Sequence, residues 1–398
     1  MSDISRPHFR TARPAAGVYA LGDEGDAVAD IRARLARLGL LGDGASPGLD
    51  TTVVFDRGTD SAVRSFQQQR GLDVDGVVGP DTYRALEEAH WRLGDRVLTH
   101  VPGNLTSGDD VVRLQQRLLD LGFPVGRVDG LFGSSTERAV REFQRNVGLP
   151  PDGTCGPATL KALGRLAPLV RGGQPNALRA EEQIRRAGPQ LSGKVVVIDA
   201  APARATDPIT ARRAAEITSD LARRIEGRLV ATGVQAFLTG HPASESERAE
   251  FANRTDANLS VSLHLDAADN PDASGVSAYY YGSDAHGVRS TAGERFAGLV
   301  QREIVARTDL ADLRTHPKTW DFLRRTSMPA VRVGVGYITN PGDAARLGDP
   351  TFRDVVAEAV VVAVQRVYLT PDVDSRTGVL RLSELRAAVR QASALPPA

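Results

Sequence analysis

The chain has 398 residues, of which 41% are apolar and 25% are charged, as in an average globular protein. This length predicts two or three domains. The 49 basic residues balance the 49 acidic ones, which argues against nucleic acid or an anionic membrane surface as the main partner.

Neither a secretory signal nor a membrane anchor is expected. The first residues, MSDISRPHFRTARPAAG, carry basic side chains but no apolar stretch of the length that a secretory signal needs. No later segment approaches the roughly 18 apolar residues of a membrane-spanning helix. We therefore expect a cytoplasmic protein without a transmembrane segment. Cys155 is the only cysteine, which fits a reducing compartment, and we expect it to have no chemical role.

Two segments of the N-terminal half repeat one another. GDAVADIRARLARLGLL at 25–41 recurs as GDDVVRLQQRLLDLGFP at 108–124. AVRSFQQQRGLDVDGVVGPDTYRAL at 62–86 recurs as AVREFQRNVGLPPDGTCGPATLKAL at 139–163. The two copies indicate one small unit that is present twice.

Each copy predicts three helices. In each copy a Gly-Asp pair caps an amphipathic first helix, with Asp26 or Asp109 as the capping residue. A second helix carries Phe66 or Phe143 inward, and Gly-Pro begins a short third helix. We expect a disordered N-terminus at 1–19, a first three-helix domain at 20–92 and a second at 100–166.

The second copy, DGLFGSSTERAVREFQRNVGLPPDGTCGPATLKAL, resembles the peptidoglycan-binding repeat that accompanies many cell-wall hydrolases. The first copy is a weaker match, because it has extra residues in DGASPGLDTTVVFDRGTDS and lacks the Asp-Gly-x-Phe-Gly element. The resemblance implies binding of peptidoglycan or its precursors. Most of the shared residues are caps, turns and core positions, so they also suit a purely structural role.

An α/β domain is expected after a Gly- and Pro-bearing connector at 167–190. The expected strands are 195–198, 234–238, 259–263, 276–281 and 331–335. The expected helices are about 209–230, 245–256, 290–307 and 351–368. This alternation predicts a three-layer α/β domain over 191–369, followed by a tail at 370–398.

The carboxyl end of the strand 195–198 is where an α/β fold usually keeps its chemistry. Asp199 opens the loop there, but Ala200, Ala201, Pro202 and Ala203 follow it, and their side chains cannot bind a metal or accept a proton.

Three stretches resemble the zinc-dependent N-acetylmuramoyl-L-alanine amidases of the amidase-3 family: KVVVIDAAPAR, ANLSVSLHLDAAD and LRRTSMPAVRVGVGYITNP. The resemblance implies a C-terminal three-layer amidase-3-like α/β domain behind two small three-helix peptidoglycan-binding-like domains. In that family two histidines and a glutamate bind zinc, and a second glutamate activates the attacking water. Such a zinc ion needs three protein ligands, one open position and a nearby carboxylate.

The resemblance places these four roles on Pro202, Ala214, His264 and Gly334. His264 alone has a suitable side chain, and a lone imidazole does not hold catalytic zinc. Glu216 is two positions from Ala214, which on a helix is another face. We therefore expect no catalytic residue and no cofactor, and His264 becomes a lone remnant of the metal site.

Two other interpretations of these residues stay open. A zinc site could be rebuilt from His264 with some of His241, His286, His316, Asp199 and Asp266. Alternatively, His264 is a partly buried histidine kept for packing or a hydrogen bond.

Arg324 and Asp266 are the residues expected in a ligand or partner groove. The family has an arginine near its substrate groove at the place of Arg324, which could receive an anionic group, and an asparagine at the place of Asp266. The alternative for Arg324 is an exposed arginine in a surface salt bridge.

The whole layout resembles a regulatory branch of the amidase-3 family. The resemblance implies a cytosolic regulator of peptidoglycan precursor synthesis, which stimulates the UDP-N-acetylglucosamine enolpyruvyl transferase after phosphorylation by a Ser/Thr kinase. The phosphorylated threonines of that branch lie in the tail, where Thr377 matches. A phosphate there would add nearly two negative charges beside Arg376 and Arg381. The alternative for Thr377 is an ordinary turn or cap residue.

Three functions are therefore weighed. The first is the non-catalytic regulator. The second is a working zinc amidase that hydrolyses peptidoglycan, which would need a rebuilt metal site. The third is a module that binds glycan or precursors without acting on an enzyme.

Overall fold

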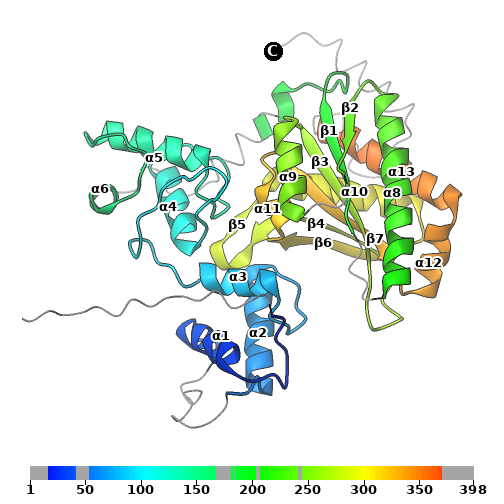
Figure 1. The fold of residues 1–398 in the computed structure, drawn as a ribbon. Coiled ribbons are helices and arrows are strands. Elements are labelled where there is room, and N and C mark those ends of the chain that lie inside the picture. Colours follow the sequence, from blue (N-terminus) through cyan, green and yellow to red (C-terminus); the bar gives the residue numbers. More distant parts are fainter. Residues whose placement is uncertain are drawn as a thin grey trace, which may run out of the picture. The chain divides into compact units, whose positions relative to one another are not determined.

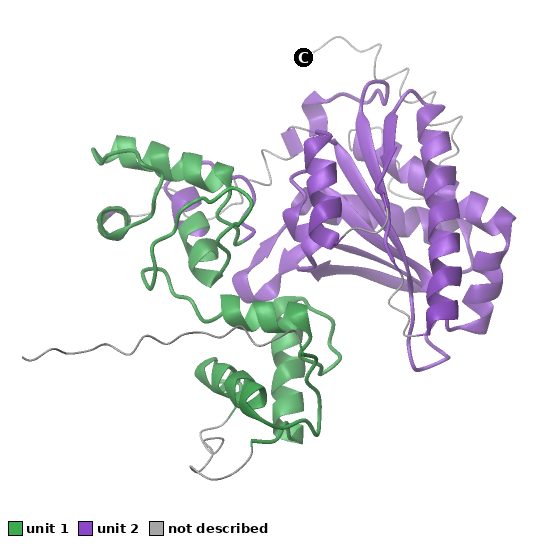
Figure 2. Cartoon of the chain, viewed as in Figure 1, with its two compact units in different colours: residues 1–115, 130–165 green, residues 116–129, 166–398 purple. Residues whose placement is uncertain are grey.

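The computed structural model of the protein describes residues 17–41, 53–166, 181–182, 184–202, 207–240 and 244–369. The chain divides into two compact units (Figure 2). Unit 1 consists of residues 1–115 and 130–165, and unit 2 consists of residues 116–129 and 166–398. The division runs through the second repeat, so that the segment 116–129 belongs to unit 2.

The first repeat forms the three predicted helices (Figure 1). They are α1 (Asp26–Arg37), α2 (Arg57–Arg70) and α3 (Pro80–Glu88). Ile31, Phe66 and Leu86 are among the apolar residues of their shared core. Tyr19, which was expected to belong to the disordered N-terminus, is part of the fold, because its amide donates to the Val78 carbonyl at 3.2 Å. The rest of the expected N-terminal tail lies outside the described residues.

The expected Gly-Asp cap is wrong in one detail. Gly25, not Asp26, is the N-cap of α1, with φ 117°, and Asp26 is the first helical residue. Glycine accepts this left-handed φ without strain, and a negative charge such as Asp26 in the first turn is favourable for the helix dipole.

The second repeat also has three helices, as predicted. They are α4 (Asp109–Asp120), α5 (Ser134–Asn146) and α6 (Pro157–Arg165). Phe143 is fully buried, as is Cys155, and burial raises the pKa of the Cys155 thiol to about 12. Such a thiol is not reactive at neutral pH.

A buried glutamine holds the Asp-Gly turn in each repeat. The Gln144 amide donates to Asp152 Oδ1 at 2.7 Å and to the Thr154 carbonyl at 3.0 Å, and its oxygen accepts the Gly153 amide at 2.9 Å. Gln67 makes the same three contacts around Asp75 in the first repeat. The sequence repeat therefore extends to the hydrogen bonds, which the helical pattern alone did not indicate.

Replacing this glutamine is expected to destabilise its repeat. Gln144→Leu leaves the buried Gly153 amide without an acceptor, so we expect a loss of about 1–3 kcal/mol in the free energy of unfolding. Gln67→Leu is expected to cost a similar amount, whereas Gln68→Leu, on the exposed face of α2, is the matched control. Urea unfolding followed by circular dichroism measures the differences. Equal stability of the Gln144 and Gln68 variants would contradict the structural role.

Unit 2 contains a seven-stranded sheet in the order β2-β1-β3-β7-β4-β5, with β6 paired to β4. Its strands are β1 (Val195–Ala200), β2 (Gln235–Leu238), β3 (Leu259–Asp266), β4 (Val276–Ser283), β5 (Val288–Arg289), β6 (Asp312–Lys318) and β7 (Ala330–Tyr337). Neighbours pair in parallel except β4, which is antiparallel to β7 and β5. The five expected strands are confirmed, and β5 and β6 are additional.

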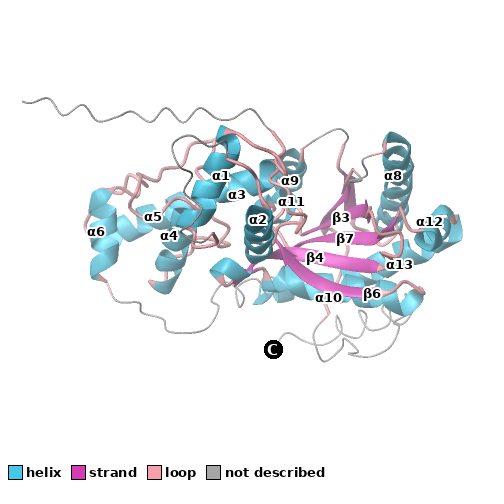
Figure 3. Ribbon diagram, turned by 90° about the horizontal axis from the view of Figure 1, so that it is seen from below, coloured by secondary structure: helices cyan, strands magenta, loops and turns pink. Residues whose placement is uncertain are grey.

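Helices cover both faces of this sheet (Figure 3). They are α8 (Pro208–Val230), α9 (Glu245–Arg254), α10 (Thr291–Arg307), α11 (Asp321–Arg325), α12 (Pro341–Gly348) and α13 (Pro350–Val367). The main core joins α8, α10 and α13 to one face, and two smaller clusters join α9 and the α11 region to the other. The predicted three-layer α/β architecture is confirmed.

No helix in the described part of the chain has the length and apolar content needed to cross a bilayer. The expected tail at 370–398, and most of the connector at 167–190, lie outside the described residues.

Candidate functional site

Asp199 lies at the end of β1 and is completely buried. Its Oδ1 is 2.9 Å from Arg248 Nε, in an ion pair in which both side chains are almost fully buried. The Thr239 hydroxyl donates to Oδ1 at 2.6 Å and the Ser262 hydroxyl donates to Oδ2 at 2.7 Å. These contacts tie β1 to α9, to β3 and to the residue after β2. The carboxylate is therefore engaged by the fold and is unsuited to the rebuilt metal site considered above.

His264 is on β3 and is only 3% exposed. Its Nε2 is 3.1 Å from Asp266 Oδ1. The Tyr279 and Trp320 rings lie beside it, with centroids 5.9 Å and 6.2 Å from the imidazole. Burial, and then the negative charge of Asp266, raises the pKa of the Tyr279 phenol to about 12. His264 thus has a packing and hydrogen-bonding role, which agrees with the second interpretation of it.

Gly334 faces His264 across the β3–β7 ladder. A Cβ atom at this glycine would be 2.2 Å from Asp266 Oδ2 and 3.0 Å from Ser277 Oγ. In this conformation the Asp266 carboxylate occupies the position of a Cβ atom at residue 334, so that a side chain there would require Asp266 to move. Asp266 and Gly334 fit one another, a relation that comparing each position with a family motif does not reveal.

The other two positions of the expected zinc set also lack donor atoms. Pro202 is exposed, and Ala214 is fully buried in the main core of unit 2. The Glu216 side chain is 68% exposed and lies 3.6 Å from Arg212 Nε. The expectation that Glu216 points to another face of its helix is confirmed.

The remaining histidines of unit 2 are occupied locally. His286 closes the short 3-10 helix Asp284–His286, and its Nδ1 is 3.1 Å from Ser283 Oγ. His316 Nε2 is 2.7 Å from the Leu313 carbonyl. His241 lies outside the described residues. Within the described ranges, no three His, Cys, Asp or Glu side chains form a group that could hold a metal ion, so these residues do not fit a three-ligand zinc site.

Arg324, on α11, is only 8% exposed, so the alternative of an exposed arginine in a surface salt bridge is wrong. Its Nε donates to the Asp129 carbonyl at 2.7 Å. The Tyr281 hydroxyl donates to the neighbouring Val128 carbonyl at 3.2 Å. Arg324 therefore holds the segment 116–129 within unit 2. Thr377 lies outside the described residues.

Comparisons with known proteins agree with the two-part layout. Residues 196–366 match the family model of the N-acetylmuramoyl-L-alanine amidases, amidase-3. Residues 24–86 and 107–163 match the peptidoglycan binding domain. The germination-specific N-acetylmuramoyl-L-alanine amidase of Bacillus subtilis is 24% identical over 37% of this chain and 60% of its own length. The structure of the amidase AmiC2 of Nostoc punctiforme is 28% identical and covers 44% of this chain and 96% of its own, with a TM-score of 0.37.

A longer match extends across both parts. N-acetylmuramoyl-L-alanine amidase CwlM of Mycobacterium tuberculosis is 45% identical over 381 residues, which are 92% of this chain and 93% of that protein. A match over 92% of the chain takes in most of the repeats and most of the α/β domain. The chain therefore belongs to the amidase-3 family and carries peptidoglycan-binding domains in front of its amidase-3 domain.

Proposed function

We propose that this chain is a non-catalytic member of the amidase-3 family that regulates peptidoglycan precursor synthesis in the cytoplasm. The observation that carries the proposal is the position of the Asp266 carboxylate, which lies where a Cβ atom at position 334 would be. In the family a glutamate at the place of Gly334 activates water, and here a carboxylate from the neighbouring strand fills that space. Pro202 and Ala214 in place of two zinc ligands support the same conclusion.

The partners follow from the regulatory branch that the layout resembles. A Ser/Thr kinase would phosphorylate the tail at Thr377, and the modified chain would bind and activate the UDP-N-acetylglucosamine enolpyruvyl transferase. The peptidoglycan-binding domains would contribute by binding soluble precursors. A phosphate on Thr377 adds charge next to Arg376 and Arg381 and can order or dock the segment.

The second candidate, a zinc amidase, is favoured by the name of the CwlM relative and by the presence of His264. The two candidates differ in metal content and in turnover. For the regulator we expect no stoichiometric zinc and no hydrolysis of a muramoyl-peptide by the purified full chain. Stoichiometric zinc with turnover that His264→Ala abolishes would establish the amidase instead.

The regulatory part has its own test. The transferase is assayed with the full chain before and after treatment with a Ser/Thr kinase of a cell-wall-synthesising bacterium. We expect stimulation by the phosphorylated natural chain and none by Thr377→Ala, with Ser375→Ala as the matched control in the same segment. Binding of glycan fragments to the repeats without any effect on the transferase would favour the binding module.

A further inference from the structure

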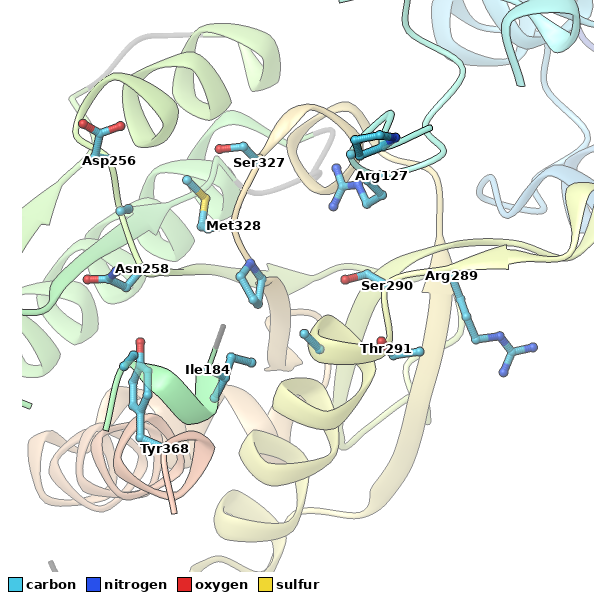
Figure 4. Close-up of a pocket in the computed structure, with 16 residues that line it drawn as sticks. Arg127, Ile184, Asp256, Asn258, Arg289, Ser290, Thr291, Ser327, Met328 and Tyr368 are labelled. Carbon is cyan, nitrogen blue, oxygen red and sulfur yellow. The ribbon is translucent and has the colours of Figure 1, made fainter. Parts of the chain in front are cut away.

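A pocket of about 610 Å³ lies at the amino ends of β3 and β7, in unit 2 (Figure 4). Its wall includes the residues just before these strands, 256–258 and 327–329, the start of α10 and Tyr368 after α13. His264 and Gly334 do not line it, so it is distinct from the site described above. Its volume is within the range of small-molecule sites, about 300–1,000 Å³.

One wall holds a buried polar group without a partner. Tyr368 is 5% exposed, and its hydroxyl has no hydrogen-bond partner among the described residues. Figure 4 shows the hydroxyl turned toward the side of the pocket where Asn258 lies. Lys194 Nζ lies over the face of the Tyr368 ring, 4.2 Å from its centroid, in a cation–π contact. A buried hydroxyl without an acceptor is unfavourable, so a molecule that supplies an acceptor here would gain affinity.

The opposite wall is positively charged. Arg127 is partly buried, donates to the Arg324 carbonyl and lies 4.4 Å over the Tyr281 ring. No carboxylate forms an ion pair with it in the part of the chain that the structure describes. Burial outweighs the nearby Asp129 and lowers the pKa of the Arg127 guanidinium. An anion in the pocket would compensate this charge.

The start of α10 adds donors to the same wall, as Figure 4 shows for Ser290, Thr291 and Arg127. The Ser290 hydroxyl accepts the amide of Gly293 at 3.1 Å. The amides of Thr291 and Ala292, which also line the pocket, come before the first helical hydrogen bond. Helix amides that have no intrahelical acceptor bind phosphate and similar anions.

We propose that this pocket binds a small molecule that carries a phosphate group. The phosphate oxygens accept hydrogen bonds from Arg127 and from the first amides of α10, and a second polar group of the ligand accepts from the Tyr368 hydroxyl. Ile184, Met328 and Pro329 provide apolar contacts for the rest of the molecule. The inference goes beyond the proposed function and does not depend on whether the chain is catalytic.

The test measures binding by the full chain with three probes: inorganic phosphate, uridine monophosphate and uridine. Calorimetry should detect both phosphate-bearing probes, and not uridine. Arg127→Met is expected to weaken both about tenfold or more, because a charge-assisted contact is lost. Tyr368→Phe is expected to weaken uridine monophosphate about fivefold and to leave inorganic phosphate unchanged.

Matched controls separate binding from folding. Tyr83→Phe removes a hydroxyl that donates to Asp30 in unit 1, and Arg212→Met removes an exposed cation on α8. Both should bind like the natural chain, and circular dichroism should show every variant folded. If Arg127→Met does not fold, Arg127→Lys replaces it in the test. Lysine keeps the positive charge but lacks the planar guanidinium that donates two parallel hydrogen bonds, so we again expect weaker binding of both phosphate probes.

Three results would overturn the proposal. The first is that neither phosphate-bearing probe binds, and the second is that both pocket variants bind as the natural chain does. The third is binding of a phosphothreonine peptide of residues 370–384 while the small probes do not bind, which would assign the pocket to the chain's own tail.

Discussion

Asp199→Asn is expected to lower the free energy of unfolding of unit 2 by about 3–5 kcal/mol, although the side chain keeps its size. The substitution removes the charge that faces Arg248, whose side chain is 2% exposed. An arginine buried without its counter-ion costs far more than a pair at the surface. The Thr239 and Ser262 hydroxyls can still donate to the side-chain oxygen of an asparagine at position 199. The lost free energy of unfolding therefore comes mainly from the ion pair.

The control is another aspartate–arginine pair of the same unit. Asp309 is 68% exposed and lies 2.6 Å from Arg346, so Asp309→Asn is expected to cost under about 1 kcal/mol. In a double-mutant cycle, Asp199→Ala with Arg248→Met should cost less than the two single changes together. The free energies come from urea unfolding. If Asp199→Asn kept full stability and instead removed bound zinc, the residue would be a metal ligand and the structural role would be wrong.

Four of the five strands that the sequence predicted are largely buried, and the fifth, β2, is a partly exposed strand at the edge of the sheet. β1 begins with a continuous apolar run, whereas β3 and β7 have apolar residues at alternate positions, and nearly all residues of the three strands are buried because helices cover both faces of the sheet. β6, with the sequence DLRTHPK, pairs only with β4 and alternates between exposed and half-buried side chains. A search for apolar runs therefore misses this strand. A strand with one neighbour at the edge of a sheet can carry exposed polar side chains.

The sequence predicted which residues stand at the four family positions, but it did not predict which other side chains surround them. The motif assigned Pro202, Ala214, His264 and Gly334 separately. Their surroundings depend on pairings between distant segments, such as Asp199 with Arg248 and Asp266 with Gly334. Polar contacts of this kind leave no periodic pattern in a sequence. The alternative of an exposed Arg324 is wrong for the same reason, because its partner Asp129 is 195 residues away, in the second repeat.

Restoring a glutamate at position 334 is the second change with a large expected effect. Gly334→Ala alone should cost about 1–3 kcal/mol, because its Cβ would meet Asp266 Oδ2 at 2.2 Å. Gly334→Glu is expected to cost about 3–5 kcal/mol, since it also adds a second carboxylate to a buried site without a partner. The matched control is Gly298→Glu on the exposed side of α10, where a Cβ meets no atom within 4 Å. That change should be neutral or slightly stabilising, because glycine disfavours a helix.

The decisive comparison adds Asp266→Ala to each variant. If Asp266 occupies the space of the missing glutamate, its removal should recover most of the loss caused by Gly334→Ala and Gly334→Glu, and the cycle should give a coupling of about 1–3 kcal/mol. Thermal and urea unfolding of the natural chain, the three single variants and the two double variants supply the free energies. Additive losses would mean that the two positions do not interact, and the observation on which the non-catalytic function rests would fail. A strong coupling would mean that the loss of the glutamate and the gain of the aspartate belong together, and that returning one residue alone cannot rebuild a hydrolytic site.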